Sequence, residues 1–189
     1  MSAKLFQQMR DCRLCEKHLP LGPRPVFQLS TQSKILIVGQ APGIKVHKTG
    51  IPWNDASGDR LREWMGVTKE EFYDTQNFGI MPIGLCYPGR GKGGDNPPRP
   101  ECAPLWMPQV LKVVQTELII LIGQYAQAYF LQDARKETLT ETVRHWKEYR
   151  PKYFVLPHPS PRNNIWLKKN PWFEKELLKP LKKEVRKLV

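Results

Sequence analysis

Four short runs of apolar residues alternate with amphipathic segments along the chain. The runs cover residues 35–38 (I-L-I-V), 78–83 (F-G-I-M-P-I), 118–122 and 153–156. Uninterrupted aliphatic runs of this length predict strands that are buried on both faces, as in a parallel sheet. The spacing of apolar residues elsewhere predicts helices near residues 3–9, 57–65 and 105–115, from 123 onward, and at 139–149 and 171–189. Because strands and helices alternate, we expect a doubly wound or three-layer α/β/α domain with a mostly parallel sheet.

Length and charge narrow the picture. The 189 residues contain no internal repeat or linker, so we expect a single domain over residues 1–189. Thirty Lys and Arg against 18 Asp and Glu give a formal charge of +12, which favours an anionic partner, nucleic acid first and an anionic membrane surface second. A well-solvated basic surface is the alternative. The longest aliphatic run, 118–122, is far shorter than the ~20 residues of a membrane-spanning helix.

The N-terminus and the cysteines bear on the compartment. Residues 1–10 contain no apolar stretch of the kind found in a signal peptide, so a cytoplasmic protein is expected. The four cysteines should then be reduced thiols rather than disulfides.

The loop after the first strand, residues 39–43 (G-Q-A-P-G), has the features of a ligand-binding turn. Gly39 ends the strand, and Pro42 and Gly43 force a turn in which the backbone can closely approach a ligand. In an open parallel sheet the ligand crevice lies beyond the carboxyl ends of the strands, where this loop is expected.

The cysteines are spaced as metal ligands. Cys12 and Cys15 form a C-x2-C pair, and Cys86 and Cys102 flank a loop rich in glycine and proline. Four soft ligands suit zinc or an iron–sulfur cluster, and composition does not choose between them. Four buried free thiols are the alternative.

The last strand runs into a second polar loop, residues 158–163 (H-P-S-P-R-N). Two prolines stiffen it and present His158 and Ser160. A neutral imidazole held in this way can donate a hydrogen bond to charge developing on a leaving group. Arg162 and Asn163 could hold phosphate oxygens. The alternative is a capped turn around a structural histidine.

An aromatic residue and a carboxylate follow the first loop. Trp53 could stack an extruded base, and Asp55 could stabilise a positively charged sugar. Core packing is the alternative for Trp53, and an N-cap of the following helix is the alternative for Asp55. Asp59 is the competing carboxylate. In the glycine-rich loop, four glycines and Pro88 surround Arg90 and Lys92.

With these residues in view, the chain resembles the uracil-DNA glycosylase superfamily. Residues 39–43 are similar to its first motif and residues 158–163 to its second, and the four cysteines are arranged as in the thermophile-type (family four) enzymes. The resemblance implies an α/β/α fold around a four-stranded parallel sheet and a [4Fe–4S] cluster held by the cysteines. It also implies hydrolysis of the N-glycosidic bond of a flipped deoxyuridine.

The resemblance also assigns roles within the pocket. The backbone around Gln40 would line it, Asp55 and His158 would be catalytic, and Trp53 would stack on the base. The remaining substrate-binding positions are Gly39, Ala41, Gly43 and Ser160. The DNA backbone would be held by Arg162, Asn163, Ser160 and the loop around Arg90 and Lys92.

Two positions depart from the family pattern. Gln40 stands where family-four enzymes usually carry an acidic residue, whereas a family-five-like alignment with a one-residue gap places the acid at Asp55. Pro82 falls roughly where family four places an asparagine that reads the uracil edge.

We therefore expect a monomeric DNA glycosylase that excises a damaged base, most simply uracil, from DNA. The alternative is a glycosylase-like module that binds DNA or a modified base without efficient catalysis. A zinc-stabilised hydrolase acting on a small nucleotide ranks last, because it leaves the basic charge unexplained.

Overall fold

The four apolar runs form one sheet. In the computed structural model, which describes residues 2–189, strands β1 (Ile35–Val38), β2 (Phe78–Ile80), β5 (Leu118–Ile122) and β6 (Tyr153–Leu156) are ordered β2-β1-β5-β6. All of their pairings are parallel, and Ile37 lies opposite both Ile80 and Ile120. The central strands β1 and β5 are buried throughout, as uninterrupted aliphatic runs require.

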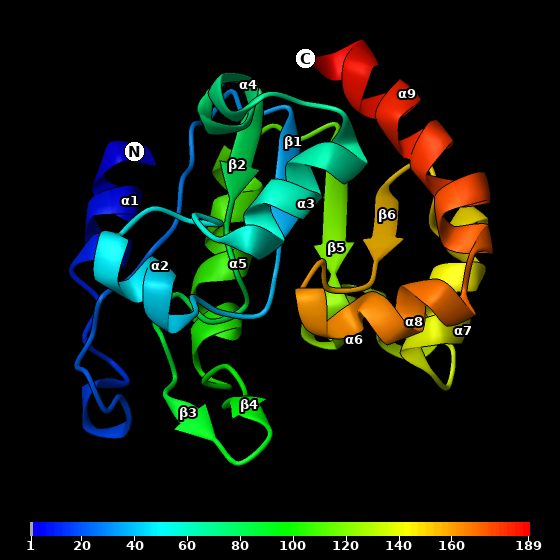
Figure 1. Cartoon of the computed structure of the whole chain (residues 1–189). Helices are drawn as coiled ribbons and strands as arrows, with labels where there is room; N and C mark the ends of the chain where they lie inside the picture. The colour runs from blue at the N-terminus through cyan, green and yellow to red at the C-terminus, as the bar shows by residue number, and fades with distance from the viewer. Residues whose placement is uncertain (1) are drawn as a thin grey trace.

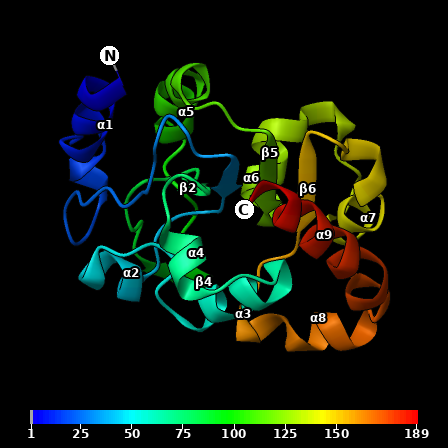
Figure 2. The ribbon, with the colours of Figure 1, turned by 90° about the horizontal axis from the view of Figure 1, so that it is seen from above.

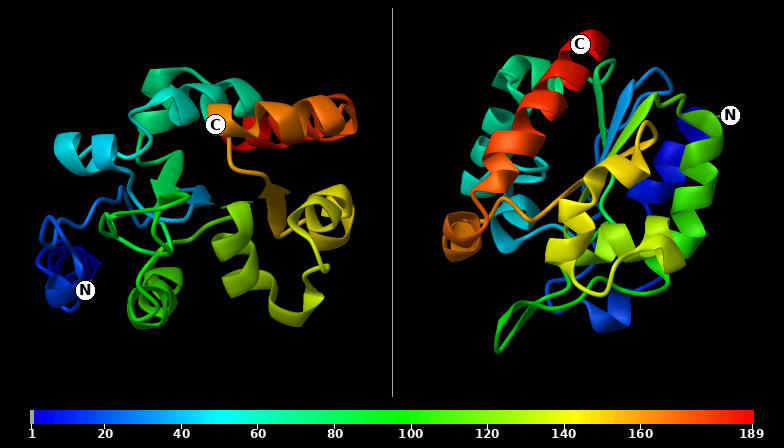
Figure 3. Two further views of the ribbon diagram at one scale, coloured as in Figure 1. Left: turned by 60° about the horizontal axis from the view of Figure 1, so that its bottom comes forward. Right: turned by 90° about the vertical axis from the view of Figure 1, so that its right-hand side faces the viewer.

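Helices cover both faces of the sheet. Figures 1, 2 and 3 show α1 (Ser2–Arg10), α5 (Cys102–Val113) and α6 (Gly123–Leu131) on one side, and α3 (Ala56–Met65) and α9 (Lys179–Leu188) on the other. The predicted three-layer α/β/α architecture with a four-stranded parallel sheet is confirmed. No helix within residues 2–189 is long and apolar enough to cross a membrane.

Several element boundaries differ from the prediction. Strand β2 ends at Ile80, and α5 begins at Cys102 rather than Leu105 and carries Pro108 inside it. Leu111 in α5, which the pattern predicts to be buried, is 38% exposed. The helix predicted over 139–149 is split into α7 (Leu139–Arg144) and the 3-10 turn η3 (Trp146–Tyr149).

Short elements were missed altogether, because a segment of five or six residues shows too little periodicity to be recognised. They are α2 (Ile44–Thr49), α4 (Lys69–Tyr73), α8 (Asn164–Lys169) and the hairpin of β3 (Arg90–Gly91) and β4 (Gly94–Asp95). Three of them, α2, α8 and the hairpin, flank the carboxyl edge of the sheet, where the ligand crevice is expected (Figure 1).

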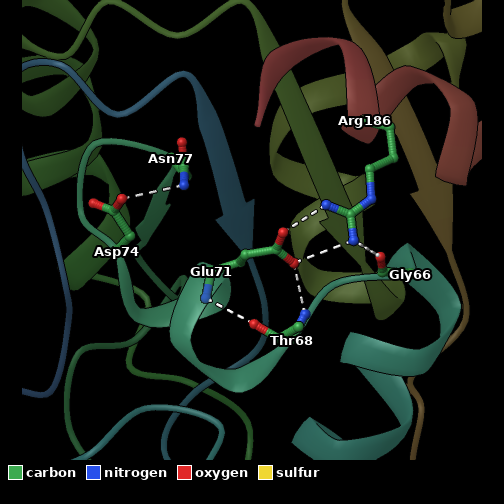
Figure 4. Close-up of polar contacts among 6 residues, drawn as sticks. All are labelled: Gly66, Thr68, Glu71, Asp74, Asn77 and Arg186. Atoms are coloured by element: carbon green, nitrogen blue, oxygen red, sulfur yellow. Dashed lines mark hydrogen bonds and ion pairs between the residues drawn. The ribbon is translucent and has the colours of Figure 1, made fainter.

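The C-terminal segment packs onto the α3 side of the sheet. It consists of the π-helix η5 (Phe173–Leu178) followed by α9, and its buried side chains are Phe173, Leu177, Leu181 and Val185. Arg186 fixes its end: the guanidinium pairs with Glu71 at 2.6 Å and donates to the carbonyl of Gly66 at 2.6 Å (Figure 4). Glu71 also completes the capping box of Thr68 in α4, so two distant helices share one carboxylate.

Candidate active site

A cavity of about 490 Å³ opens at the carboxyl edge of the sheet. The loops after β1, β2 and β6, the start of α3 and the tip of the hairpin all contribute to its walls. Its lining includes ten of the predicted site residues: Gly39, Gln40, Ala41, Gly43, Trp53, Asp55, His158, Ser160, Arg162 and Asn163. The two polar loops that are more than a hundred residues apart in sequence therefore meet at one cavity.

The loop after β1 is held mainly through its backbone. The carbonyls of Gly39 and Gln40 accept hydrogen bonds from the N–H groups of Ile83 and Gly84, both at 2.9 Å. The Gln40 side chain donates from Nε2 to the carbonyl of Asn96 at 3.2 Å, which ties this loop to the base of the hairpin. The residue whose backbone is predicted to line the pocket therefore also anchors the cavity wall through its side chain.

Trp53 lies across the cavity wall in an unusual backbone conformation. Its φ is +55°, and its indole approaches Gly39 so closely that a Cβ there would lie 3.0 Å from the ring atom Cζ2. The indole and the imidazole of His158 are 5.5 Å apart between ring centroids, at an interplanar angle of 32°. Trp53 is half-buried, so one part of the ring packs while another part faces the cavity.

Asp55 combines the two interpretations that the sequence left open. It is the N-cap of α3, where Oδ1 accepts from the N–H of Gly58 at 2.9 Å, and it also lines the cavity. The negative charge of Asp55 acts on His158 by raising its pKa, in opposition to burial. Asp59, the competing carboxylate, instead forms an ion pair with Arg62, with 2.5 Å between Oδ1 and Nη2, and its side chain is 77% exposed.

His158 is held as a neutral imidazole with a defined tautomer. Burial lowers its pKa, and the attraction of Asp55 offsets this only in part. Its Nδ1 accepts a hydrogen bond from the N–H of Ser160 at 3.2 Å. Because Nδ1 is the acceptor, the proton of the neutral ring resides on Nε2, which is then a donor.

The rest of the second loop positions this histidine. The hydroxyl of Ser160 accepts from the N–H of Arg162 at 3.2 Å, and the carbonyl of Ser160 accepts from Arg60 at 3.2 Å. Asn163 donates from Nδ2 to the carbonyl of His158 at 2.7 Å. The predicted phosphate contacts of Ser160 and Asn163 thus share these groups with bonds internal to the loop.

The hairpin forms the far side of the mouth. A Cβ on Gly94 would lie 3.0 Å from a guanidinium nitrogen of Arg162, so the hairpin and the second loop approach each other. Arg90 and Lys92 are exposed on the hairpin but do not line the cavity. Asp95, which the sequence reasoning missed, does line it, and burial raises its pKa while Arg162 and Arg90 oppose the shift.

The cysteines gather in a second, smaller cavity. Cys12, Cys15, Cys86 and Cys102 all line it, together with Arg99 and apolar residues that include Leu19, Pro23, Pro25 and Leu85. All four cysteines are free thiols. Burial raises the pKa of Cys86 to about 11 and that of Cys102 to about 12. No three His, Cys, Asp or Glu side chains within residues 2–189 converge as a site for a single metal ion.

Other lining residues carried no signal in the sequence. Val26, Val46, Pro52, Ile80 and Ser57 contribute to the cavity wall, and Pro82, identified by its departure from the family pattern, lies among them. Most are apolar and come from elements whose relation to the sheet edge depends on the tertiary fold. Asp95 could have been noticed as a carboxylate inside a glycine-rich basic loop.

Comparison with known proteins agrees with this geometry. Residues 26–182 match the family model described as uracil DNA glycosylase superfamily. The chain is also similar to the Type-4 uracil-DNA glycosylase of Thermotoga maritima, with 23% identity over 138 residues that cover 71% of this chain and 68% of that protein. The match includes both loops that form the cavity, and the chain belongs to the uracil DNA glycosylase superfamily.

Proposed function

We propose that this protein is a DNA glycosylase that hydrolyses the N-glycosidic bond of a flipped damaged base, uracil being the first candidate. One observation carries the proposal: Trp53, Asp55 and His158 meet at a single cavity between the loops that follow β1 and β6. A flat base extruded from DNA could stack against the half-buried indole, as enzymes of this type require. Membership of the superfamily and the similarity to a Type-4 uracil-DNA glycosylase support it.

The proposed reaction assigns separate roles to the two titratable groups. As the bond from C1′ to the base nitrogen breaks, its electron pair leaves with the base, and the Nε2–H of His158 donates a hydrogen bond to the resulting anion. The lowered pKa suits this role, since His158 remains neutral and its Nδ1 is already occupied. Asp55 would stabilise the cationic sugar and orient the water whose oxygen bonds to C1′. That water keeps one proton in the new hydroxyl group and loses the other to solvent or to Asp55.

DNA outside the pocket would be held by the basic rim. Arg162 and Asn163 lie at the mouth, and Arg90 and Lys92 extend the positive charge along the hairpin. Phosphate contacts of this kind fix the register of the duplex and make binding sensitive to salt. The backbone of residues 39–43 and the Ser160 loop would contact the flipped nucleotide. We propose that the protein acts as a cytoplasmic monomer.

The residues of the small cavity fit an iron–sulfur cluster. Cys12, Cys15, Cys86 and Cys102 offer four soft donors within apolar walls, and the buried Nε of Arg99 has no hydrogen-bond partner among residues 2–189. Such an N–H could donate to sulfur and offset the negative charge of bound thiolates. Four soft donors within apolar walls suit a [4Fe–4S] cluster, with a zinc ion as the alternative. When bound, the cluster would supply a cross-link between the N-terminus and α5, and no redox step is needed for hydrolysis.

A glycosylase-like binding module is the second candidate. It is favoured by the side chain of Gln40, which is bonded to Asn96 and stands where the family-four pattern has an acid. It is also favoured by Pro82, which offers neither an amide side chain nor an N–H to a base. Such a module would bind DNA with strong salt dependence and form no abasic product.

A base panel distinguishes the two. Labelled oligonucleotides containing uracil, hypoxanthine or xanthine, single- and double-stranded, are incubated with the protein and then treated with alkali to cleave abasic sites. We expect cleavage at uracil, reduced about a hundredfold or more in His158→Ala. Binding without an abasic product for any base would establish the module instead. Turnover of free nucleosides without DNA affinity would support the nucleotide hydrolase.

A further inference from the structure

The backbone of Trp53 needs an external restraint. Within residues 2–189, Trp53 and Gln132 are the non-glycine residues with positive φ, and Trp53 has φ +55°. For a bulky residue this left-handed conformation costs free energy, and it persists where the surroundings enforce it. The restraint must come from contacts to the segment of Pro52, Trp53 and Asp55, since this segment belongs to no helix or strand.

Three contacts hold this segment, and they come from residues that do not line the cavity. The guanidinium of Arg62 donates from Nη1 to the carbonyl of Trp53 at 3.4 Å. The hydroxyl of Tyr73 donates to the carbonyl of Pro52 at 2.8 Å. The Trp53 carbonyl itself fills the space beside Gly58, where a Cβ would lie 1.8 Å from the oxygen.

The side chain of Arg62 in α3 is buried, although arginine side chains are usually exposed. Its side chain is 9% exposed and is packed over the rings of Phe72, at 5.2 Å, and Tyr73, at 5.9 Å, and it pairs with Asp59. Burial of a guanidinium is unfavourable unless its donors are satisfied, so the carbonyl of Trp53 and the carboxylate of Asp59 are required partners. Burial also raises the pKa of the Tyr73 hydroxyl, which stays a donor to Pro52.

We infer that Arg62 is a positioning residue for base stacking. Through its hydrogen bond to the Trp53 carbonyl it holds Trp53 in its strained conformation, with the indole between Gly39 and His158. It acts only through this carbonyl and makes no contact with the substrate. The inference rests on the proposed function for its kinetic consequence, but the restraint itself does not. Arg62 has no place in the cavity lining. Its effect must therefore pass through Trp53.

The chain offers a matched control. Arg150 is also partly buried, pairs with Glu184 at 2.7 Å, and packs over Phe154 at 4.9 Å and Trp146 at 6.0 Å. It lies outside the cavity lining. Arg150→Met should therefore reproduce a general loss of packing and charge without disturbing Trp53.

The first measurement reads Trp53 directly. The full chain is labelled with 5-fluorotryptophan, and the ¹⁹F signal of Trp53 is assigned from Trp53→Phe. In Arg62→Met we expect this signal to shift and broaden, in Arg62→Lys to recover in part because an ammonium can still donate to the carbonyl, and in Arg150→Met to stay unchanged. An unchanged Trp53 signal in folded Arg62→Met, as judged by circular dichroism, overturns the inference.

The second measurement is a kinetic cycle on a uracil-containing duplex. Arg62→Met should lower the single-turnover cleavage rate by about 10- to 100-fold, as expected when a group is misplaced by about 1 Å, while affinity for undamaged duplex is retained. In Trp53→Gly, which removes both ring and strain, the same change should have no further effect. An equal loss in both backgrounds refutes action through Trp53. If the wild-type protein cleaves no base, the proposed function fails, and the ¹⁹F measurement alone decides the role of Arg62.

Discussion

Gly58→Ala sets helix propensity against the packing of the active site. Gly58 lies in the first turn of α3, where alanine would ordinarily stabilise the helix by about 1 kcal/mol relative to glycine. Here, however, a Cβ would lie 1.8 Å from the carbonyl oxygen and 2.7 Å from the carbonyl carbon of Trp53, and real contacts essentially never fall below 3.0 Å. The oxygen must therefore move by at least 3.0 − 1.8 = 1.2 Å.

Backbone atoms cannot rotate away as the end of a flexible side chain can. Overpacking of this kind typically costs about 1–3 kcal/mol and sometimes more. Because the atoms met are backbone atoms, we take the upper part of this range, about 2–3 kcal/mol, and subtracting the gain in propensity leaves a net loss of about 1–2 kcal/mol in the free energy of unfolding. For a chain of this size that corresponds to a fall in Tm of about 2–8 °C.

Thermal unfolding followed by circular dichroism measures this change. Ser57→Ala, one residue earlier in the same helix, is the control, since it removes a hydroxyl for which no hydrogen bond is found in residues 2–189. We expect its Tm to stay level or rise slightly. If Gly58→Ala proves as stable as wild type, the Trp53 carbonyl is not rigidly held, and the reasoning about this segment is wrong.

Four further predictions follow from the site. Asp55→Asn should keep the stability of α3, because asparagine caps a helix as well as aspartate does, but it should lower the rate of cleavage of a uracil substrate. Asp55→Ala should lower that rate and also lower the free energy of unfolding by about 1 kcal/mol. Equal activity of wild type and Asp55→Asn in the gel assay would remove the carboxylate from the mechanism. Cys102→Ser should lose bound iron and visible absorption in anaerobically purified protein, measured by metal analysis, and an unchanged iron content would exclude it as a ligand. Burial lowers the pKa values of both His158 and His47, so the unfolded chain binds protons at a higher pH than the folded chain does, and the free energy of unfolding should be complete above about pH 6.5 and decline as the pH falls below it. His158→Gln should flatten the corresponding decline in Tm. A wild-type Tm that is independent of pH between about 5 and 7 would contradict this prediction. Arg162→Gln should weaken binding to undamaged DNA, measured by fluorescence anisotropy, and reduce the slope of log binding constant against log salt concentration by about 1. An unchanged slope would show that Arg162 does not contact the phosphates.

The sequence by itself determined the sheet and much of the site. The runs at 35–38, 118–122 and 153–156 became buried parallel strands at those boundaries, since an uninterrupted aliphatic run has few other stable environments. Once the strands are parallel, their carboxyl ends share an edge, so the loops beginning at Gly39 and His158 had to lie near each other. This logic is local and periodic, and it can be read from the order of residues.

The tertiary structure decided what each side chain does there. Gln40 bonds to Asn96, 56 residues away, and Asn163 bonds to the carbonyl of His158, so two predicted ligand contacts also hold the walls. Arg62 drew no attention in the sequence because its target is a backbone carbonyl nine residues earlier, in a strained conformation that no composition reveals. Periodicity fixes which face of an element is buried, but hydrogen-bond partners depend on how separate elements meet in space, and that is settled only when the whole chain has packed.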